Sequence, residues 1–359
     1  MGHNGTYKKL KKLPPERDKV ETISVLRQVG KASQSLGELK GIAKTMPNQA
    51  MLINAVVLQE AKDSSQIENI ITTQDELYKA LVSQGKHPAQ VKEVINYRKA
   101  IFTGYELIKK QGFLRMKDLE IIQSTIVHNN AGIRALPGTV LKNDVTGEVV
   151  YTPPQEKDEI IDLLSNFLEY FNVNRTGLSP LINLAILHHQ FESIHPFYDG
   201  NGRTGRVLNI LYLIINDLLD VPILYLSSYI NENKAKYYKH LSYVNETGLW
   251  EDYILFMVDA VDATARYTIN KIGRINDLLA KTIEKVKIEA PKIYRKELVE
   301  VIFEHPYSKI EFVVDKLKVE RKAASRYLKK LESIGVLKSE KVGREVLYLN
   351  TDLIDVLKQ

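Results

Sequence analysis

A segment of twelve residues, HPFYDGNGRTGR from His195 to Arg206, contains the residue types that bind and transfer phosphoryl groups. Gly200 and Gly202 flank an asparagine, and glycine backbones can turn several consecutive N–H groups toward one anion. Residues 203–219 are almost wholly apolar after their first turn, as in a buried helix whose positive N-terminal end would face the same anion. The segment therefore predicts a phosphate-binding loop.

Four side chains around this loop are charged or can accept a proton. Arg203 and Arg206 are three residues apart, so they share a face of the first helical turn and could grip a polyphosphate. Asp199 offers a hard oxygen ligand that suits a Mg²⁺ ion shared with substrate phosphates. His195 can accept a proton near neutral pH, since the ordinary pKa of histidine is about 6.5. A capping loop without chemistry is the alternative, and this combination of residues disfavours it.

In this order the residues resemble the signature of the Fic family, HPFx(D/E)GNGRxxR, at every defined position. The resemblance implies transfer of AMP from ATP to a Tyr, Thr or Ser hydroxyl of a target protein, which could be the chain itself. It further implies that His195 removes the proton of that hydroxyl, and that Asp199 holds Mg²⁺ against the α and β phosphates.

The resemblance also assigns residues to ATP binding. The amides of the glycine loop and the Asn201 side chain would stabilise charge on the α phosphate, and the two arginines would hold the β and γ phosphates. Tyr238 and Asn245 would border the adenine, one packing against the base and one hydrogen-bonding to it. The residues assigned to ATP are Gly200, Asn201, Gly202, Arg203, Thr204, Gly205, Arg206, Tyr238 and Asn245.

A second group of residues, Ser64, Glu68 and Asn69, precedes the loop in the chain. Ser64 and Glu68 are four residues apart and share one face of a helix, which by itself is typical of a solvated face. Together the three residues match (S/T)xxxE(G/N), the inhibitory motif of the same family, in the subgroup that carries it ahead of the core. The resemblance implies that Glu68 pairs with Arg206 and misaligns ATP, and a shift of about 1 Å can lower the rate roughly a hundredfold.

Two other functions fit the same residues. One is a transcriptional regulator that senses ATP through this site and binds DNA through another part of the chain. The other is the reverse reaction, removal of AMP from modified proteins, with Glu68 orienting a water molecule. Retained ATP affinity without transfer would favour the first, and Glu68-dependent release of AMP would favour the second.

Composition limits the remaining classes. At 359 residues the chain is long enough for two or three domains, and its net charge of +6 is modest for this size. The absence of cysteine excludes disulfides, thiolate metal sites and cysteine nucleophiles. We find no apolar signal region and no uninterrupted membrane span, so we expect a cytoplasmic protein without membrane contact.

Apolar periodicity predicts a mainly α-helical fold. Ser33, Ser35 and Gly37 are expected to interrupt the first helix, and Thr73 with Glu76 forms a capping box for a later one. Two β-prone runs, 140–141 and 149–151, predict a hairpin around residues 143–147, which resembles the Fic flap that holds an extended target by strand addition. The other expected helices cover residues 20–46, a stretch from 48 to the inhibitory residues, 89–110, 117–127, 156–172, 181–191, 203–219 and 250–290.

His188 and His189 precede the loop on a predicted helix. We expect them to be packed or hydrogen-bonded, because no carboxylate or cysteine is spaced to complete a zinc site with them.

The C-terminal residues resemble a winged-helix domain. Helices 310–317 and 320–334 have helix-turn-helix spacing, and strands 336–338 and 345–349 would form the wing across residues 341–344. DNA binding, docking of a protein partner and homodimer formation are alternatives for this domain. The side chains predicted to face solvent on the second helix are Arg321, Lys322, Ser325, Arg326, Lys329 and Lys330.

These patterns divide the chain into four parts. They are an N-terminal helical region at 1–90 that carries the inhibitory residues, a Fic core at 91–262, a connecting helix at 263–290 and a winged-helix domain at 291–359.

Overall fold

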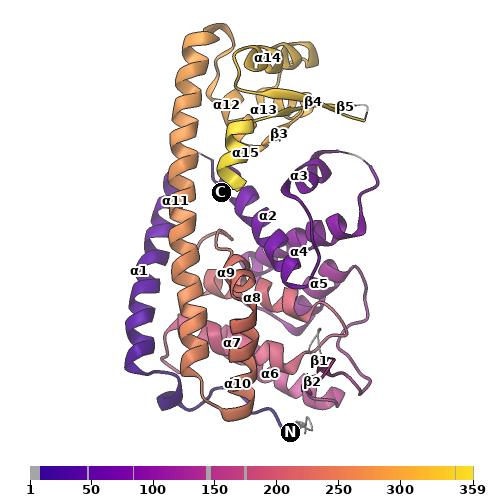
Figure 1. Ribbon diagram of the computed structural model, residues 1–359, viewed down its shortest axis with the longest axis vertical. Helices are drawn as coiled ribbons and strands as arrows, with labels where there is room; N and C mark the ends of the chain where they lie inside the picture. Colours follow the sequence, from indigo (N-terminus) through magenta and orange to yellow (C-terminus); the bar gives the residue numbers. More distant parts are fainter. Residues whose placement is uncertain are drawn as a thin grey trace.

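Helix α11 (Glu251–Glu289) extends along most of the molecule, and the other elements are arranged along it (Figure 1). The structure is a computed structural model that describes residues 9–46, 48–83, 85–142, 147–173, 176–343 and 345–358. Within these residues the fold is mainly α-helical, as predicted, with two small antiparallel sheets. Residues 251–289 form one helix because they contain no proline and their apolar side chains recur at helical spacing.

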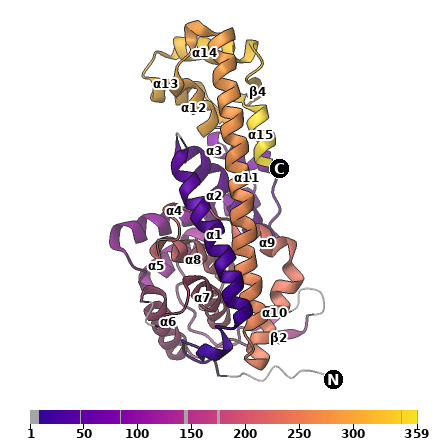
Figure 2. The ribbon, with the colours of Figure 1, turned by 90° about the vertical axis from the view of Figure 1, so that its left-hand side faces the viewer.

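Helix α1 (Ile23–Thr45) lies beside the lower part of α11 in both views of the molecule (Figure 2). The predicted interruption at Ser33, Ser35 and Gly37 was wrong, since the helix is continuous. Ser35 is buried and donates a hydrogen bond to Oδ1 of Asp262 on α11 at 2.6 Å. Packing against α11 therefore outweighs the weak helix propensity of these residues.

Four helices follow in the N-terminal half of the chain. The side chain of Asn48 caps α2, and the predicted capping box of Thr73 and Glu76 is present at the start of α3. The helices are α2 (Gln49–Ile67), α3 (Gln74–Val82), α4 (Ala89–Gln111) and α5 (Met116–Val127).

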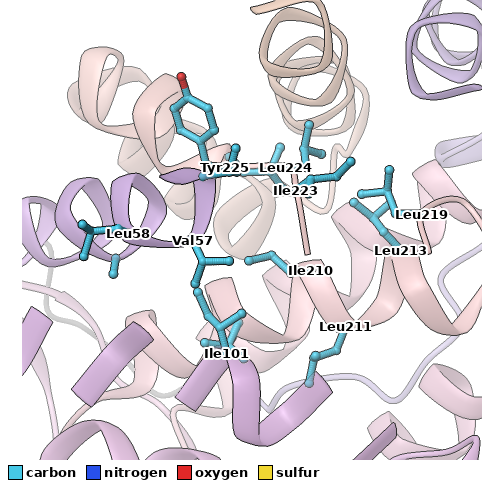
Figure 3. Packing of buried hydrophobic residues seen from close by; sticks show 14 of the residues in the cluster. Val57, Leu58, Ile101, Ile210, Leu211, Leu213, Leu219, Ile223, Leu224 and Tyr225 are labelled. Atoms are coloured by element: carbon cyan, nitrogen blue, oxygen red, sulfur yellow. The ribbon is translucent and has the colours of Figure 1, made fainter. Parts of the chain in front are cut away.

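The buried centre of the molecule is built around α7 (Pro180–Ile194) and α8 (Asn201–Ile215), with α6 (Lys157–Asn172) against α7. Nearly every residue of α7 is buried, and this helix starts with Ser179 as its cap and Pro180 as its first residue. Figure 3 shows Ile210 of α8 packed with Val57 of α2 and other apolar side chains. The loop between α7 and α8 is therefore held between two helices that cannot shift without opening the core.

A short hairpin precedes this centre in the chain. Strands β1 (Leu141–Lys142) and β2 (Val149–Tyr151) pair antiparallel, with Leu141 opposite Tyr151. The predicted hairpin is confirmed in its two strands, and most of its predicted turn, residues 143–146, lies outside the described residues. After α8 come α9 (Leu226–Glu232) and α10 (Lys234–Thr247), which lead into α11.

The C-terminal unit has the element order of a winged helix. Both predicted helices are present, whereas the first wing strand begins at Lys338, later than predicted, and continues to Val342. Strand order in the sheet is β3-β5-β4, with antiparallel pairing throughout. The elements are α12 (Lys296–Glu304), β3 (Tyr307–Ser308), α13 (Ile310–Leu317), α14 (Arg321–Ser333), β4 (Lys338–Val342), β5 (Glu345–Leu349) and α15 (Thr351–Lys358).

Two 3-10 turns complete the described elements, Arg17–Lys19 and Pro291–Ile293. None of the helices in the described part of the chain combines the length and apolarity that crossing a membrane requires.

The close packing of α4 on α8 gives a test of the core. A Cβ atom at Gly104 would lie 2.7 Å from Cδ1 of Leu211, whereas a Cβ at Gly37 of α1 would have no atom within 4 Å. We expect Gly104→Val to lower the free energy of unfolding by about 1–3 kcal/mol through overpacking. Gly37→Ala should raise it by roughly 0.5–1 kcal/mol, because alanine restricts the unfolded chain and favours the helix. Urea unfolding would measure both, and equal stability of the two variants would contradict this packing.

Candidate active site

His195 ends helix α7 in a left-handed backbone conformation, with φ at 49°. Its N–H donates to the carbonyl of Phe191 at 3.0 Å, and its carbonyl accepts a hydrogen bond from Nε of Arg134 at 2.7 Å. Burial, reinforced by the charge of Arg134, lowers the pKa of the His195 imidazole to about 4. The ring is therefore neutral at pH 7 and able to accept a proton.

The glycine loop turns through Gly200, which has φ at 79° and precedes the first residue of α8. The side chain of Asn201 is almost completely buried, and it accepts from the N–H of Phe197 at 2.9 Å and donates to its carbonyl at 2.8 Å. This side chain therefore fixes the shape of the loop, and its contact with the α phosphate stays a prediction.

The first turn of α8 offers backbone donors. The amides of Asn201, Gly202 and Arg203 have no acceptor within the helix, because an α-helix leaves its first amides unpaired. Thr204 pairs with the carbonyl of Gly200 through both its N–H, at 2.9 Å, and its hydroxyl, at 2.8 Å. These contacts direct the free amides and the positive end of the helix toward the loop.

Asp199 lies at the outer edge of the loop with a side chain that is 67% exposed. Its Oδ1 accepts from the N–H of Gly200 at 2.6 Å, and its carbonyl accepts from the Gln123 amide at 2.9 Å. In the described residues no three His, Cys, Asp or Glu side chains gather as a metal site. A single exposed carboxylate nevertheless fits Mg²⁺, which keeps several waters and takes most other ligands from substrate phosphates.

Arg203 is nearly buried and already has acidic partners. Its Nη1 lies 3.0 Å from Oε2 of Glu93 on α4, and its Nη2 lies 3.5 Å from Oδ1 of Asp199. Glu93 was not found from the sequence, since an acidic residue on an amphipathic helix gives no signal of its own. This carboxylate orients the guanidinium and leaves it beside the loop.

Arg206 is the most enclosed charge of the site, with a side chain that is 2% exposed. Its Nε donates to Oγ of Ser64 at 2.7 Å, and its Nη2 donates to the Ser64 carbonyl at 3.0 Å and to Oε1 of Glu68 at 2.7 Å. The structure therefore brings the second arginine of the loop together with the two residues predicted to restrain it.

Glu68 sits directly over the N-terminus of α8. A Cβ at Gly202 would lie 2.6 Å from Oε1 of Glu68, so only glycine allows this approach. Burial by itself would raise the pKa of Glu68, but the charge and hydrogen bond of Arg206 outweigh it and hold that pKa below its ordinary value. The ionised carboxylate thus occupies a position built for an anion.

The segment that carries Glu68 is held at its end by α10. Asn69 has φ at 61°, a left-handed conformation that asparagine tolerates. Lys234 of α10 donates to the carbonyl of Ile67 at 2.6 Å and lies 3.4 Å from Oδ1 of Asn69. Asn69 therefore terminates α2 and leaves Glu68 facing the loop.

The two residues assigned to adenine both lie on α10. Asn245 accepts a hydrogen bond from Oγ of Ser193 at 3.2 Å, which places it close to the end of α7. Tyr238 is 43% exposed and its ring contacts buried Tyr237 edge-on, with centroids 5.1 Å apart. The contact with Ser193 places Asn245 near the end of α7, and the assignment of both residues to adenine stays a prediction.

His188 and His189 are buried and packed, as expected. Nε2 of His188 lies 2.8 Å from the Tyr237 hydroxyl, and the ring of His189 meets that of Trp250 edge-on with centroids 4.8 Å apart. Burial lowers the pKa of His188 to about 3 and that of His189 to about 4, so both rings are neutral.

Sequence profiles of known families match three successive parts of the chain. The Fic/DOC family N-terminal profile matches residues 26–106, and the Fic/DOC family profile matches residues 113–213, which include the whole loop. The C-terminal domain of SoFic-like protein adenylyltransferases matches residues 278–353. The chain belongs to the Fic/DOC family.

Protein adenylyltransferases from other organisms are similar to parts of this Fic chain. The protein adenylyltransferase Fic of Aedes aegypti is 26% identical over 199 residues, which are 55% of this chain and 38% of that protein. A probable protein adenylyltransferase of Aquifex aeolicus is 37% identical over 79 residues, 22% of this chain and 23% of that one. The chain therefore spans less than half of the length of these relatives.

Solved structures show the same fold. A Fic family protein from Desulfovibrio desulfuricans superposes with a TM-score of 0.61 at 18% identity, covering 94% of this chain and 98% of that one. Fic-1 from C. elegans superposes with a TM-score of 0.53 at 20% identity, covering 69% of this chain and 74% of that one.

Two residues near the Fic loop had no assigned role. Glu192 is one turn before His195, its Oε1 is buried without a hydrogen-bond partner among the described residues, and burial raises its pKa to about 7. A Cβ at Gly205 would collide with this oxygen, so the glycine between the two arginines makes room for Glu192. A carboxylate on an otherwise apolar helix was the available signal for it.

Arg134 is the other residue that the sequence did not single out, and it joins the flap to the loop. It is fully buried and donates to the carbonyls of His195, Pro154 and Ile194. In addition, the Tyr151 hydroxyl of β2 donates to the Ser193 carbonyl at 3.0 Å. The hairpin is therefore fixed relative to the imidazole of His195.

The neutral state of His195 can be measured without any activity assay. With its pKa near 4, against about 6.5 in an unfolded chain, the ring should remain neutral at pH 5.5. Since the unfolded chain then binds more protons, the contribution of His195 to stability should be present above pH 6.5 and fall as the pH drops toward 4. NMR of the imidazole nitrogens, with His195→Ala for assignment, would measure this. A protonated ring at pH 6 would contradict the burial described here.

Proposed function

We propose that this chain is a protein adenylyltransferase that restrains itself. It would transfer AMP from ATP to a Tyr, Thr or Ser hydroxyl, and Glu68 would hold it in an inactive state. The observation that carries the proposal is the contact of Glu68 with Arg206 over the first turn of α8. Arg206 would bind a substrate anion in the active state and the carboxylate of Glu68 in the restrained state.

The reaction needs positioning, charge neutralisation and a base, and the site offers each of them. The neutral imidazole of His195 takes the proton of the target hydroxyl as its oxygen bonds to the α phosphorus. The bond from that phosphorus to the oxygen bridging to the β phosphate breaks, and pyrophosphate leaves. Amides of the first turn of α8 stabilise the charge that develops on the α phosphate.

The two arginines receive the leaving group. Arg203, oriented by Glu93, faces the β phosphate, and Arg206 takes the γ phosphate once Glu68 has moved away. Asp199 would hold a Mg²⁺ ion, which when bound neutralises phosphate charge. On α10, Asn245 and Tyr238 border the adenine.

The flap places the target. Val150 of β2 is 50% exposed and Leu136, ahead of β1, is 69% exposed, so apolar side chains are presented around the hairpin. An extended segment of the target would pair with the backbone of this hairpin, which positions a hydroxyl without reading its neighbours. Because Arg134 and Tyr151 fix the hairpin to α7, the hydroxyl is delivered to His195.

For the proposed domains we keep the limits predicted from the sequence, at residues 90, 262 and 290. Helix α11 crosses the limit at 262 without a break. We therefore assign residues 263–290 to the upper part of α11, which joins the Fic core to the winged-helix domain.

Removing the carboxylate should release the enzyme. We expect Glu68→Gly to raise AMP transfer roughly a hundredfold, because Arg206 becomes available and ATP aligns for in-line attack. Glu68→Gln keeps the side-chain shape without its charge and should give a smaller rise. The measurement is incorporation of label from α-labelled ATP into cell lysate protein and into the chain itself.

The control is the double variant Glu68→Gly with His195→Ala, which should incorporate no label. If Glu68→Gly transferred AMP no faster than the wild type, inhibition by Glu68 would be contradicted. Glu68-dependent release of AMP from a modified target would favour the reverse reaction.

DNA binding by the C-terminal unit is a second candidate function. The second helix of the pair, α14, lies at the end of the molecule remote from α7 and α8 (Figure 1). Lys322, Arg326 and Lys329 are exposed on it, whereas Arg321 pairs with Glu311 of α13. Exposed cations on a recognition helix can contact DNA phosphates.

We expect Lys329→Glu to weaken a DNA mobility shift and to reduce the slope of log K against log salt by about one. Lys281→Glu, at an exposed position of α11, is the matched control and should have a much smaller effect. Equal effects of the two substitutions would contradict DNA binding through this helix.

A further inference from the structure

A cavity of about 330 Å³ lies where the C-terminal unit meets the helices that carry the inhibitory residues. Helices α2, α3 and α4 form one side, and the segment from α12 through β3 to α13 forms the other. Small-molecule sites often have this size and often lie between domains. The cavity is separate from the loop between α7 and α8.

Most of the cavity wall is apolar. Met51 and Ala55 of α2, Leu81 of α3 and Phe312 of α13 line it. Tyr78 and Tyr307 line it from opposite sides and stack on each other, with ring centroids 5.2 Å apart and planes 12° from parallel. The shape and chemistry of this wall suit a flat apolar body.

One cation faces this apolar wall without a matching anion. Nη2 of Arg98 donates to Oδ1 of Asn54 at 2.8 Å, and its guanidinium lies over the Phe102 ring at 4.9 Å. Its Nε is buried without a hydrogen-bond partner, and no carboxylate of the described residues contributes to the electrostatic environment of its charge. Burial lowers the pKa of Arg98, as expected for a partly buried cation that has no anion beside it.

The acidic residue of the cavity is already engaged elsewhere. Glu304 accepts from the Asn48 amide at 2.9 Å and from Nζ of Lys316 at 3.3 Å. It therefore does not neutralise Arg98. The unsatisfied charge of the cavity is positive, so an anion would relieve it.

We propose that this cavity binds a small organic carboxylate with a flat apolar body. Its carboxylate pairs with Arg98, and its body lies against the stacked tyrosines and the apolar side chains of α2 and α13. Neutral apolar molecules of the same shape bind more weakly, because they leave the guanidinium unpaired.

The cavity exists only while the two sides are docked, and three polar contacts join them. Asn48, the cap of α2, donates to Glu304, as described above. The Tyr307 hydroxyl donates to Oδ1 of Asp75 at 2.6 Å, and Lys79 lies 2.7 Å from Glu340 of β4. These contacts hold α2 at its start and α3 just after the inhibitory residues.

Occupancy of the cavity therefore favours the restrained state. A ligand that binds the docked arrangement and not the undocked one stabilises docking by mass action. Docking fixes α2, and the end of α2 carries Ser64 and Glu68 against Arg206. This regulatory step rests on the proposed function, whereas binding of the carboxylate does not.

Calorimetry of the full chain with 2-naphthoate as the probe tests the site. We expect saturable binding with one site per chain, and binding at least tenfold weaker for 2-naphthalenemethanol, the neutral molecule of matching shape. Arg98→Met keeps most of the side-chain volume and should weaken 2-naphthoate at least tenfold while leaving the alcohol unchanged.

A second variant protects the test against misfolding of the first. Ala55→Phe fills the cavity and retains Arg98, so it should abolish binding of both probes. Absence of saturable 2-naphthoate binding to the wild type would overturn the proposal, and so would equal affinities for the acid and the alcohol or unchanged affinity in Arg98→Met.

Measurements of AMP transfer distinguish a failure of the cavity proposal from a failure of the proposed function. If both hold, 2-naphthoate lowers AMP transfer by the wild type severalfold and has little effect on Glu68→Gly. Binding that depends on Arg98 without AMP transfer in any variant would support the cavity and overturn the enzyme. AMP transfer that the bound acid leaves unchanged in the wild type would overturn the regulatory step.

Discussion

At Arg206 a buried guanidinium has an anion beside it, and the site depends on this pairing. Its side chain is almost completely enclosed, so removal of its partner would leave an uncompensated charge inside the protein. Glu68 supplies that anion from a helix far away in the sequence, with Ser64 taking two further hydrogen bonds. A triphosphate could replace Glu68 only by offering the same charge in the same place. In the proposed mechanism, the restrained and active states therefore compete for one position.

Contacts of helix α2 with neighbouring helices hold Glu68 in place beside Arg206. Glu60 of α2, one turn before Ser64, is buried and bonded to the Tyr97 hydroxyl of α4 and to Ser227 of α9. Lys234 of α10 holds the far end of the same helix. Helix α2 thus meets three other helices around its last turns, and it cannot rotate Glu68 away without breaking buried polar contacts.

Local signals in the sequence predicted much of this protein. The glycine loop, the Ser64 and Glu68 spacing, the capping box at Thr73 and the helix pair 310–317 and 320–334 each depend on residues close together in the chain. What could not be predicted depends on distant partners. Ser35 within α1 bonds to Asp262 and Arg203 pairs with Glu93, and neither pairing leaves a trace in local spacing. The hydrogen bonds of the Asn201 amide to the backbone of Phe197 were also not predicted, because a short motif does not determine the orientation of an amide.

The bare backbone at Gly202 has an evolutionary consequence. The space above it holds the carboxylate of Glu68 and, under the proposed function, a substrate phosphate in its place, so any larger residue there would exclude the two together. A lineage cannot escape restraint by altering this glycine without losing catalysis as well. Constitutively active descendants should therefore arise through changes in helix α2, while the loop stays intact. Natural variation that alters inhibition should accordingly occur in residues that are distant in sequence from the catalytic loop.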